Sequence, residues 1–178
     1  MSEHTELVVA LDVPETDQRR KAAEVNEWLR ASGWSAPDSS TSEPGASAAL
    51  GRRADPFVVR TAGASPSGQI LCSVEDSMWD AVSDMEGPRC RNCNKEIADD
   101  DISDLGDWLF GPEPSFACAG CGTVARAGDM NVENSLVFGN PGITIECFGY
   151  DGIEMARHLL SDVRRAFDNR WAYVHRRL

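Results

Sequence analysis

Two pairs of cysteines are the most specific chemical feature of the sequence. Cys90 and Cys93 form one Cys-x-x-Cys pair, and Cys118 and Cys121 form a second pair further along the chain. Each pair places two sulfur atoms on one tight turn, so the two turns together offer four thiolates at the corners of a tetrahedron. In a reducing compartment this ligand set predicts structural Zn(II). Four cysteine ligands leave no open position for water or substrate, which argues against a catalytic metal.

The residues around the two pairs suit an anionic metal centre. Arg89, Arg91 and Lys95 flank the first pair, and positive charge near a thiol lowers its pKa and offsets the charge of the thiolates. Gly120 and Gly122 lie in and directly after the second pair, where the absence of a side chain lets backbone N–H groups approach the sulfur atoms. We expect these five residues to support the ligands.

The double Cys-x-x-Cys motif resembles that of zinc-ribbon proteins, over about residues 88–126 only. The resemblance implies an inserted zinc-ribbon module with a structural metal ion. The sequence between the pairs is mostly polar, so ordering it costs conformational entropy that packing alone does not recover. Structural zinc contributes about 10–16 kcal/mol in finger peptides, which is enough to order such a segment.

Other uses of the cysteines remain open. Iron binds the same four ligands in rubredoxin-like sites, although the first pair lacks the glycine expected after its second cysteine. A redox dithiol or disulfides are further alternatives, which the presence of two matched pairs disfavours. Cys72 and Cys147 lie outside the pairs and share strand faces with apolar residues, so we expect both in the core.

An acidic run lies between the two pairs. It includes Asp99, Asp100, Asp101, Asp104 and Asp107. The run lacks the glycine and the closing glutamate of an EF-hand, so it predicts a helix cap or a solvated face for a basic protein partner rather than a calcium site. Trp108 and Phe110 beside it are either an aromatic anchor for that partner or part of the packing of the module.

Charge is distributed unevenly along the chain. The net charge is −12, yet residues 152–178 carry six arginines against three carboxylates. Arg164, Arg165 and Arg176 belong to this basic end, which is the best case in the sequence for nucleic-acid binding. The alternative for Arg164 and Arg165 is pairing with neighbouring carboxylates such as Asp162 and Asp168. The acidic remainder would repel nucleic acid and membrane surfaces and would favour a basic protein partner. We therefore expect nucleic-acid binding to be the weaker hypothesis.

Alternating and helical patterns predict the elements that carry these residues. Strands are expected over 5–13, 56–63, 68–75 and 171–178, helices over 17–33, 76–86 and 151–171, and a hairpin over 134–150. This order predicts one α+β domain over 1–178, a ferredoxin-like split βαβ sandwich with two helices on an antiparallel sheet. A different α+β sheet, or a sheet extended by the hairpin, is the alternative. Residues 34–55 are rich in Ser, Pro, Ala and Gly and predict a flexible loop.

The compartment and the function follow from what the sequence contains and lacks. It has no apolar stretch of about 20 residues and no basic flank at the N-terminus, so we expect a cytoplasmic protein without a membrane span. Common nucleotide-binding and nucleophile motifs are missing. We therefore expect a non-enzymatic, acidic zinc-binding protein that acts through protein–protein interaction, as an adaptor, inhibitor or immunity protein. The alternatives are a nucleic-acid-associated zinc-ribbon protein that uses the basic C-terminal helix and strand, and an enzyme whose site the sequence does not reveal.

Overall fold

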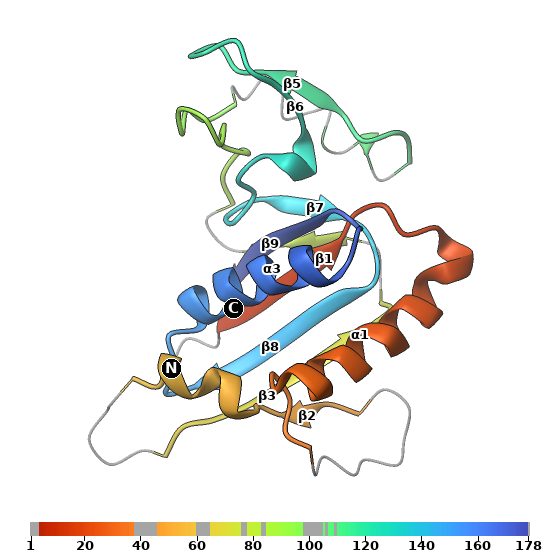
Figure 1. The fold of residues 1–178 in the computed structure, drawn as a ribbon. Coiled ribbons are helices and arrows are strands. Elements are labelled where there is room, and N and C mark those ends of the chain that lie inside the picture. The colour runs from red at the N-terminus through yellow and green to blue at the C-terminus, as the bar shows by residue number, and fades with distance from the viewer. Residues whose placement is uncertain are drawn as a thin grey trace.

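The computed structural model describes residues 4–37, 46–59, 65–75, 78–82, 85–97, 105, 107–108 and 110–177. Its central layer is a five-stranded sheet with the strand order β2-β3-β8-β1-β9, in which all neighbouring strands are antiparallel (Figure 1). The strands are β1 (His4–Ala10), β2 (Ala48–Ala49), β3 (Ser67–Ser73), β8 (Gly142–Phe148) and β9 (Trp171–Arg177). The chain is thus a mixed α/β protein built on antiparallel sheets.

Two helices cover one face of this sheet (Figure 1). Helix α1 (Gln18–Ser32) follows the 3-10 turn η1 (Glu15–Asp17) and ends at Gly33, whose φ of +82° is accessible to glycine at little cost. Helix α3 (Gly152–Ala166) begins at Asp151, whose carboxylate accepts a hydrogen bond from the backbone N–H of Glu154 at 3.1 Å. The spacing of these two residues is that of a capping box. The apolar stripes of both helices face the sheet.

The alternation along β1 divides the interior into two cores. Val8 and Ala10 point toward the helices and pack with Val25, Leu29 and other residues of the first core. Leu7 and Val9 point to the opposite face and belong to a second core. Because successive side chains of a strand lie on opposite faces, one strand contributes to both cores.

The second core joins the cysteine-bearing segment to the back of the sheet. Two short pairs of strands lie there: β4 (Met78–Asp80) with β7 (Leu136–Phe138), and β5 (Ser115–Ala117) with β6 (Val124–Arg126). The 3-10 helix η3 (Ala127–Asp129) follows β6. Besides Leu7 and Val9, the second core contains Trp79, Ala81, Ile97, Leu105, Trp108, Phe116, Ala127, Met130, Val132, Val137, Phe138, Ala172 and Val174. Residues from within 88–126 therefore pack against the sheet as well as around the cysteines.

Two of the predicted elements are wrong. Residues 134–150 do not form a hairpin, because β7 pairs with β4 whereas β8 pairs with β1 and β3. The two strands separate because Val137 is buried in the second core and Ile143 and Ile145 in the first. The helix predicted over 76–86 is also wrong: its described residues include strand β4, in which buried Trp79 lies between the exposed Met78 and the half-buried Asp80.

The region between α1 and β3 contains regular elements in its described parts. The 3-10 helix η2 (Arg52–Phe57) begins inside the segment predicted as a flexible loop and overlaps the start of the strand predicted over 56–63. Strand β2 and the buried Trp34 also lie within 34–55. Residues 38–45 and 60–64 lie outside the described chain. None of the described helices combines the length and the apolar character that a membrane span requires.

Candidate metal centre

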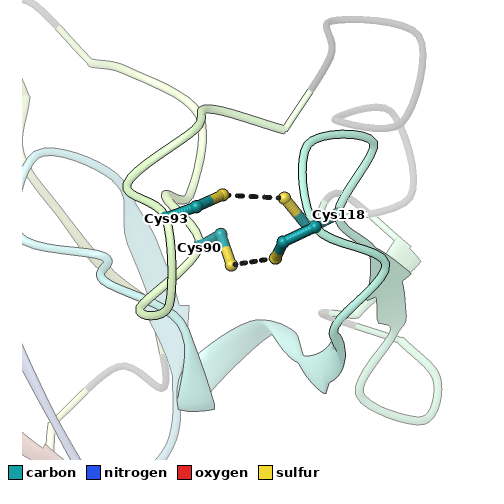
Figure 2. A group of neighbouring side chains, drawn as sticks. Cys90, Cys93 and Cys118 are labelled. Carbon is teal, nitrogen blue, oxygen red and sulfur yellow. Dashed lines mark hydrogen bonds between the residues drawn. The ribbon is translucent and has the colours of Figure 1, made fainter.

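The four paired cysteines converge at one point in the structure. All four Sγ atoms lie within 4.8 Å of one another, with 3.5 Å between Cys93 and Cys118 and 3.6 Å between Cys90 and Cys121 (Figure 2). A tetrahedron with metal–sulfur bonds of about 2.3 Å has edges of about 3.8 Å, so the sulfur atoms are close to the spacing of a tetrathiolate site. A disulfide requires about 2.05 Å, and all six cysteines of the chain are free thiols. The cluster can bind a metal ion.

The two cysteine turns have the same backbone hydrogen bonds. In the first turn, the N–H of Asn94 donates to the carbonyl of Cys90 at 2.8 Å, and in the second the N–H of Gly122 donates to the carbonyl of Cys118 at 2.8 Å. The N–H of Cys90 donates to the carbonyl of Lys95 at 2.9 Å, as that of Cys118 does to the carbonyl of Thr123. Two turns of equal geometry therefore face each other, each presenting two sulfur atoms.

Both turns contain a residue in the left-handed region directly after the second cysteine. Asn94 has a φ of +59° and Gly122 a φ of +72°. After glycine, asparagine is among the residues that adopt this conformation most readily, since its short polar side chain tolerates it. Asn94 thus takes the place of the glycine that the sequence lacks after the first pair.

Gly120 lies against the opposite cysteine turn. A Cβ atom on Gly120 would lie 3.2 Å from the Sγ of Cys93 and 3.0 Å from the Cδ of Lys95. The N–H of Gly120 also donates to the Sγ of Cys118 at 3.4 Å. The absence of a side chain at Gly120 therefore lets the two turns approach closely enough for their sulfur atoms to share one ion.

Replacing Gly120 by Ala is expected to weaken metal retention. The added methyl group must displace the Sγ of Cys93 by a few tenths of an ångström, and changes next to metal ligands typically cost about 10- to 100-fold in affinity. Competition with a chromogenic chelator measures the change. Ala119→Gly, which removes a side chain from the same turn, is the control. Equal affinity for Gly120→Ala and the control would contradict the close approach.

Local hydrogen bonds favour the thiolate form of two ligands. The backbone N–H groups of Gly120 and Cys121 lower the pKa of Cys118. The hydroxyl of Thr123 lies 3.2 Å from the Sγ of Cys121, and this group, the Asn92 side chain and the Thr123 N–H lower the pKa of Cys121 to about 5. Since the thiolate is the form that binds metals, the second turn is prepared for metal binding near neutral pH.

The two cysteines outside the cluster, Cys72 and Cys147, have raised pKa values. Burial raises the pKa of Cys72 well above its usual range. Burial, together with the negative charges of Glu6 and Asp151, raises the pKa of Cys147 to about 11. Both residues pack in or against the first core, as the sequence predicted.

We expect the order of alkylation to follow these thiol pKa values. After the metal is removed with a chelator at pH 7.5, Cys121 is mostly thiolate because its pKa of about 5 lies below the pH, whereas Cys147 is mostly thiol because its pKa of about 11 lies above it. Iodoacetamide should therefore modify Cys121 before Cys147 and Cys72, as measured by peptide mass spectrometry over time. Modification of Cys147 before Cys121 would contradict the environments described here.

The three basic residues predicted to support the cysteines differ in their contacts. Arg89 forms ion pairs with Glu86 at 3.1 Å and with Glu96 at 3.0 Å, so carboxylates already balance its charge. The Lys95 side chain lies over Gly120, and Arg91 lies beside Cys90 in the lining of two clefts. Within the described part of the chain, Arg91 and Lys95 form no ion pair and can therefore offset thiolate charge.

An ion-pair network attaches the cysteine-bearing segment to strand β9. Arg170 donates to both carboxylate oxygens of Glu113, at 2.6 and 2.9 Å, and to Asp129 at 2.9 Å. These hydrogen bonds, with Glu113 contributing most, hold the pKa of Arg170 above its usual range despite partial burial. Glu113 also accepts from the N–H of Gly128 at 2.8 Å. Sequence reasoning missed this network, because Glu113 and Arg170 have no local spacing that links them.

The aromatic residues predicted to contact a partner differ in their exposure to solvent. Trp108 is only 8% exposed and packs edge-on against Phe138 in the second core, whereas Phe110 is 90% exposed. Trp108 thus contributes to packing rather than to the surface. Asp100, Asp101 and Asp104 lie outside the described residues.

The predicted C-terminal arginines bind groups of the chain itself. Arg165 pairs with Asp162 at 2.6 Å. Arg164 donates to the backbone carbonyl of Trp171 at 3.1 Å, and Arg176 donates to the carbonyl of Asp80 at 3.3 Å. The pairing of Arg165 with Asp162 is the one that the sequence suggested.

A second polar group that sequence reasoning missed lies beneath the start of α3. Glu6 is 2% exposed and accepts hydrogen bonds from the hydroxyl of Tyr173 and from the ring of His175, the latter at 2.8 Å. A glutamate in the otherwise apolar alternation of β1 is the signal that could have indicated it. Because Tyr173 and His175 each form a hydrogen bond with Glu6, the burial of the three side chains is compatible with a stable core.

The arrangement at the cysteines can hold a metal ion in a closed site and offers no free coordination position for chemistry. Searches of protein-family models, of curated proteins and of solved structures find no match to this chain.

Proposed function

We propose that Cys90, Cys93, Cys118 and Cys121 hold one structural Zn(II) ion. The observation that supports this most is the pair of equal turns that bring four sulfur atoms within 4.8 Å of one another. Zinc accepts a tetrahedral set of four thiolates and imposes no further geometric demand. Iron binds the same set and is the less favoured ion. When bound, the ion cross-links the two turns.

We further infer that residues 88–126 form a zinc-ribbon module inserted in a ferredoxin-like sandwich. The strand order β3-β8-β1-β9, with α1 and α3 on one face (Figure 1), supports the ferredoxin-like sandwich. A split βαβ fold places its two helices on one side of an antiparallel sheet. The equal cysteine turns, the second of which connects the paired strands β5 and β6, support the zinc-ribbon assignment.

We propose that the protein is not an enzyme and acts by binding a basic protein, as an adaptor, inhibitor or immunity protein. The closed thiolate cluster supports a structural rather than a catalytic metal. The net charge of −12 supports a basic partner, because complementary charge accelerates association. A cytoplasmic location, where cysteines stay reduced, is consistent with metal binding by all four.

The contacts of the arginines weigh against the nucleic-acid alternative. Arg157 pairs with Glu133 and Glu154, Arg165 with Asp162, and Arg170 with Glu113 and Asp129. Guanidinium groups that already bind carboxylates of the same chain contribute little to a phosphate-binding surface. The affinity of such a surface comes from unpaired cationic side chains that neutralise phosphates and release counterions from the nucleic acid. An enzyme with a site elsewhere stays a third candidate, favoured by no specific group of the described residues.

Two experiments on the zinc-loaded chain test the proposed function. On a heparin column at low salt, the protein is expected to pass through, whereas a nucleic-acid binder would be retained. The immobilised protein is expected to capture one basic protein from its native lysate and to release it at about 0.5 M salt, where charge attraction is screened. Retention on heparin, or recovery of small metabolites alone, would contradict the proposal. A variant with exposed glutamates of the described chain changed to Gln, which reduces the net negative charge, is the matched control.

A further inference from the structure

A cleft of about 370 Å³ lies between the first cysteine turn and helix α3. Arg91 and Asn94 line it from the cysteine turn, Arg157 and Arg164 from the helix, and Tyr173 from β9. The cleft lies where the cysteine-bearing segment meets the body of the protein. Its volume is near the lower end of the range of small-molecule sites, about 300–1,000 Å³.

The positive charges of this cleft are not all balanced by the protein. Arg157 is balanced, because Glu133 lies at 2.9 Å and Glu154 at 2.7 Å. Among the residues that the structure describes, Arg91 and Arg164 each have no carboxylate within the 4.0 Å of an ion pair. The hydrogen bond of Arg164 to the carbonyl of Trp171 fixes its guanidinium without neutralising it. Two guanidinium groups without a described carboxylate in ion-pair contact thus line one cleft, and the more distant charge of Asp129 acts on both of them.

These two groups are close enough to influence each other. Partial burial, and then the positive charge of Arg91, lower the pKa of Arg164. Like charges that line one partly desolvated cleft repel each other, and this repulsion is unfavourable until a negative charge lies between them. The planar, fork-shaped guanidinium binds carboxylate and phosphate oxygens with two parallel hydrogen bonds.

The rest of the lining supplies further donors and an apolar wall. The side-chain amides of Asn94 and Asn131 can donate to oxygen atoms. Leu160, which is half-buried, provides the accessible apolar wall next to them, with the buried Met130 and Val132 behind it. We propose that this cleft binds a small organic oxyanion, with the anionic group between Arg91 and Arg164 and the apolar part against Leu160.

The same arginines have a competing explanation in the neighbouring metal centre. Zn(II) with four thiolates has a formal charge of −2, and Arg91 directly follows one of the ligands. If the two arginines only offset this charge, their removal would affect metal retention and not the binding of an anion. Metal content and anion affinity must therefore be measured on the same samples.

The test is a calorimetric titration of the zinc-loaded full-length protein with inorganic phosphate and with phenyl phosphate. Both probes are expected to bind with a stoichiometry of one, and phenyl phosphate more tightly because its ring covers the apolar wall. Arg91→Gln and Arg164→Gln are each expected to weaken binding by about tenfold or more, with unchanged zinc content. Arg165→Gln is the matched control, since this neighbour on α3 pairs with Asp162, does not line the cleft, and should leave affinity unchanged.

Several results would overturn the proposal. These are the absence of saturable binding by the wild-type protein, an equal loss of affinity in Arg165→Gln, and loss of zinc from Arg91→Gln together with normal phosphate binding. Should Arg164→Gln fail to fold because its bond to Trp171 is lost, the exposed Arg91 still provides the decisive variant. The proposal is independent of the protein partner, because capture of that partner and titration with phosphate use separate readouts.

Discussion

Replacing Cys118 by Ser is expected to abolish stoichiometric metal binding and to unfold the cysteine-bearing segment around it. Cys118 is buried and contributes one of four sulfur atoms within 4.8 Å, so three ligands remain and the fourth position opens to water. In finger peptides a structural zinc ion contributes about 10–16 kcal/mol, more than the 2–5 kcal/mol that truncating a large core side chain typically costs. Elemental analysis and amide hydrogen exchange, read segment by segment, measure the two effects.

The helix-covered core is expected to survive this substitution. It contains residues of α1, α3, β1 and β8 and includes none of the four clustered cysteines. Protection of α1 and α3 should therefore persist, while protection around the β5–β6 pair is lost. Cys147→Ser is the matched control and should keep both metal and protection. If Cys118→Ser kept one metal ion per chain, or lost α1 and α3 together with the metal, the modular role of the ion would be wrong.

Replacing Arg170 by Ala is expected to lower the free energy of unfolding by about 3 kcal/mol. Its side chain is 18% exposed and that of Glu113 is 12% exposed, so the substitution leaves a largely buried carboxylate without its cation. Removing one partner of a buried ion pair typically costs about 3–5 kcal/mol, and the partial exposure of Asp129 places this case at the lower end. Urea denaturation followed by circular dichroism measures the change.

Arg126→Ala is the control for this effect. Arg126 belongs to the same network, 3.4 Å from Asp129, but its side chain is half exposed, so its removal should cost less than about 1 kcal/mol. Equal losses for the two variants would show that the attachment of the segment to β9 does not depend on the pair of Arg170 with Glu113. The metal content of both variants should stay at the wild-type value.

The regular elements with a long apolar pattern were predictable from the sequence. Strand β1 contains the apolar run 7–10, and α3 has both a helical stripe and the cap formed by Asp151 and Glu154. Short elements were not predictable in this way. Strands β4 and β7 have three residues each, too few to distinguish a period of two from one of 3.6, and their pairing depends on Trp79 and Val137 entering a core formed by distant residues.

The convergence of the four cysteines was predictable, and most of their surroundings were not. The spacing of the cysteines is local, so the sequence contains it directly. The left-handed conformation of Asn94 was missed because asparagine adopts it less often than glycine. The charge balance was missed because it depends on pairs far apart in the sequence, such as Arg170 with Glu113. Arg164 was expected to pair with a carboxylate and instead donates to a carbonyl.

The zinc K-edge X-ray absorption spectrum of the purified, untagged protein tests the central claim most directly. The structure brings Cys90, Cys93, Cys118 and Cys121 to the spacing of a tetrathiolate site. We therefore expect a zinc absorption edge whose height corresponds to one zinc per chain, and a single shell of four sulfur atoms at about 2.3 Å from the zinc. A spectrum without a zinc edge in protein that also lacks iron, or a shell dominated by nitrogen and oxygen, would contradict it.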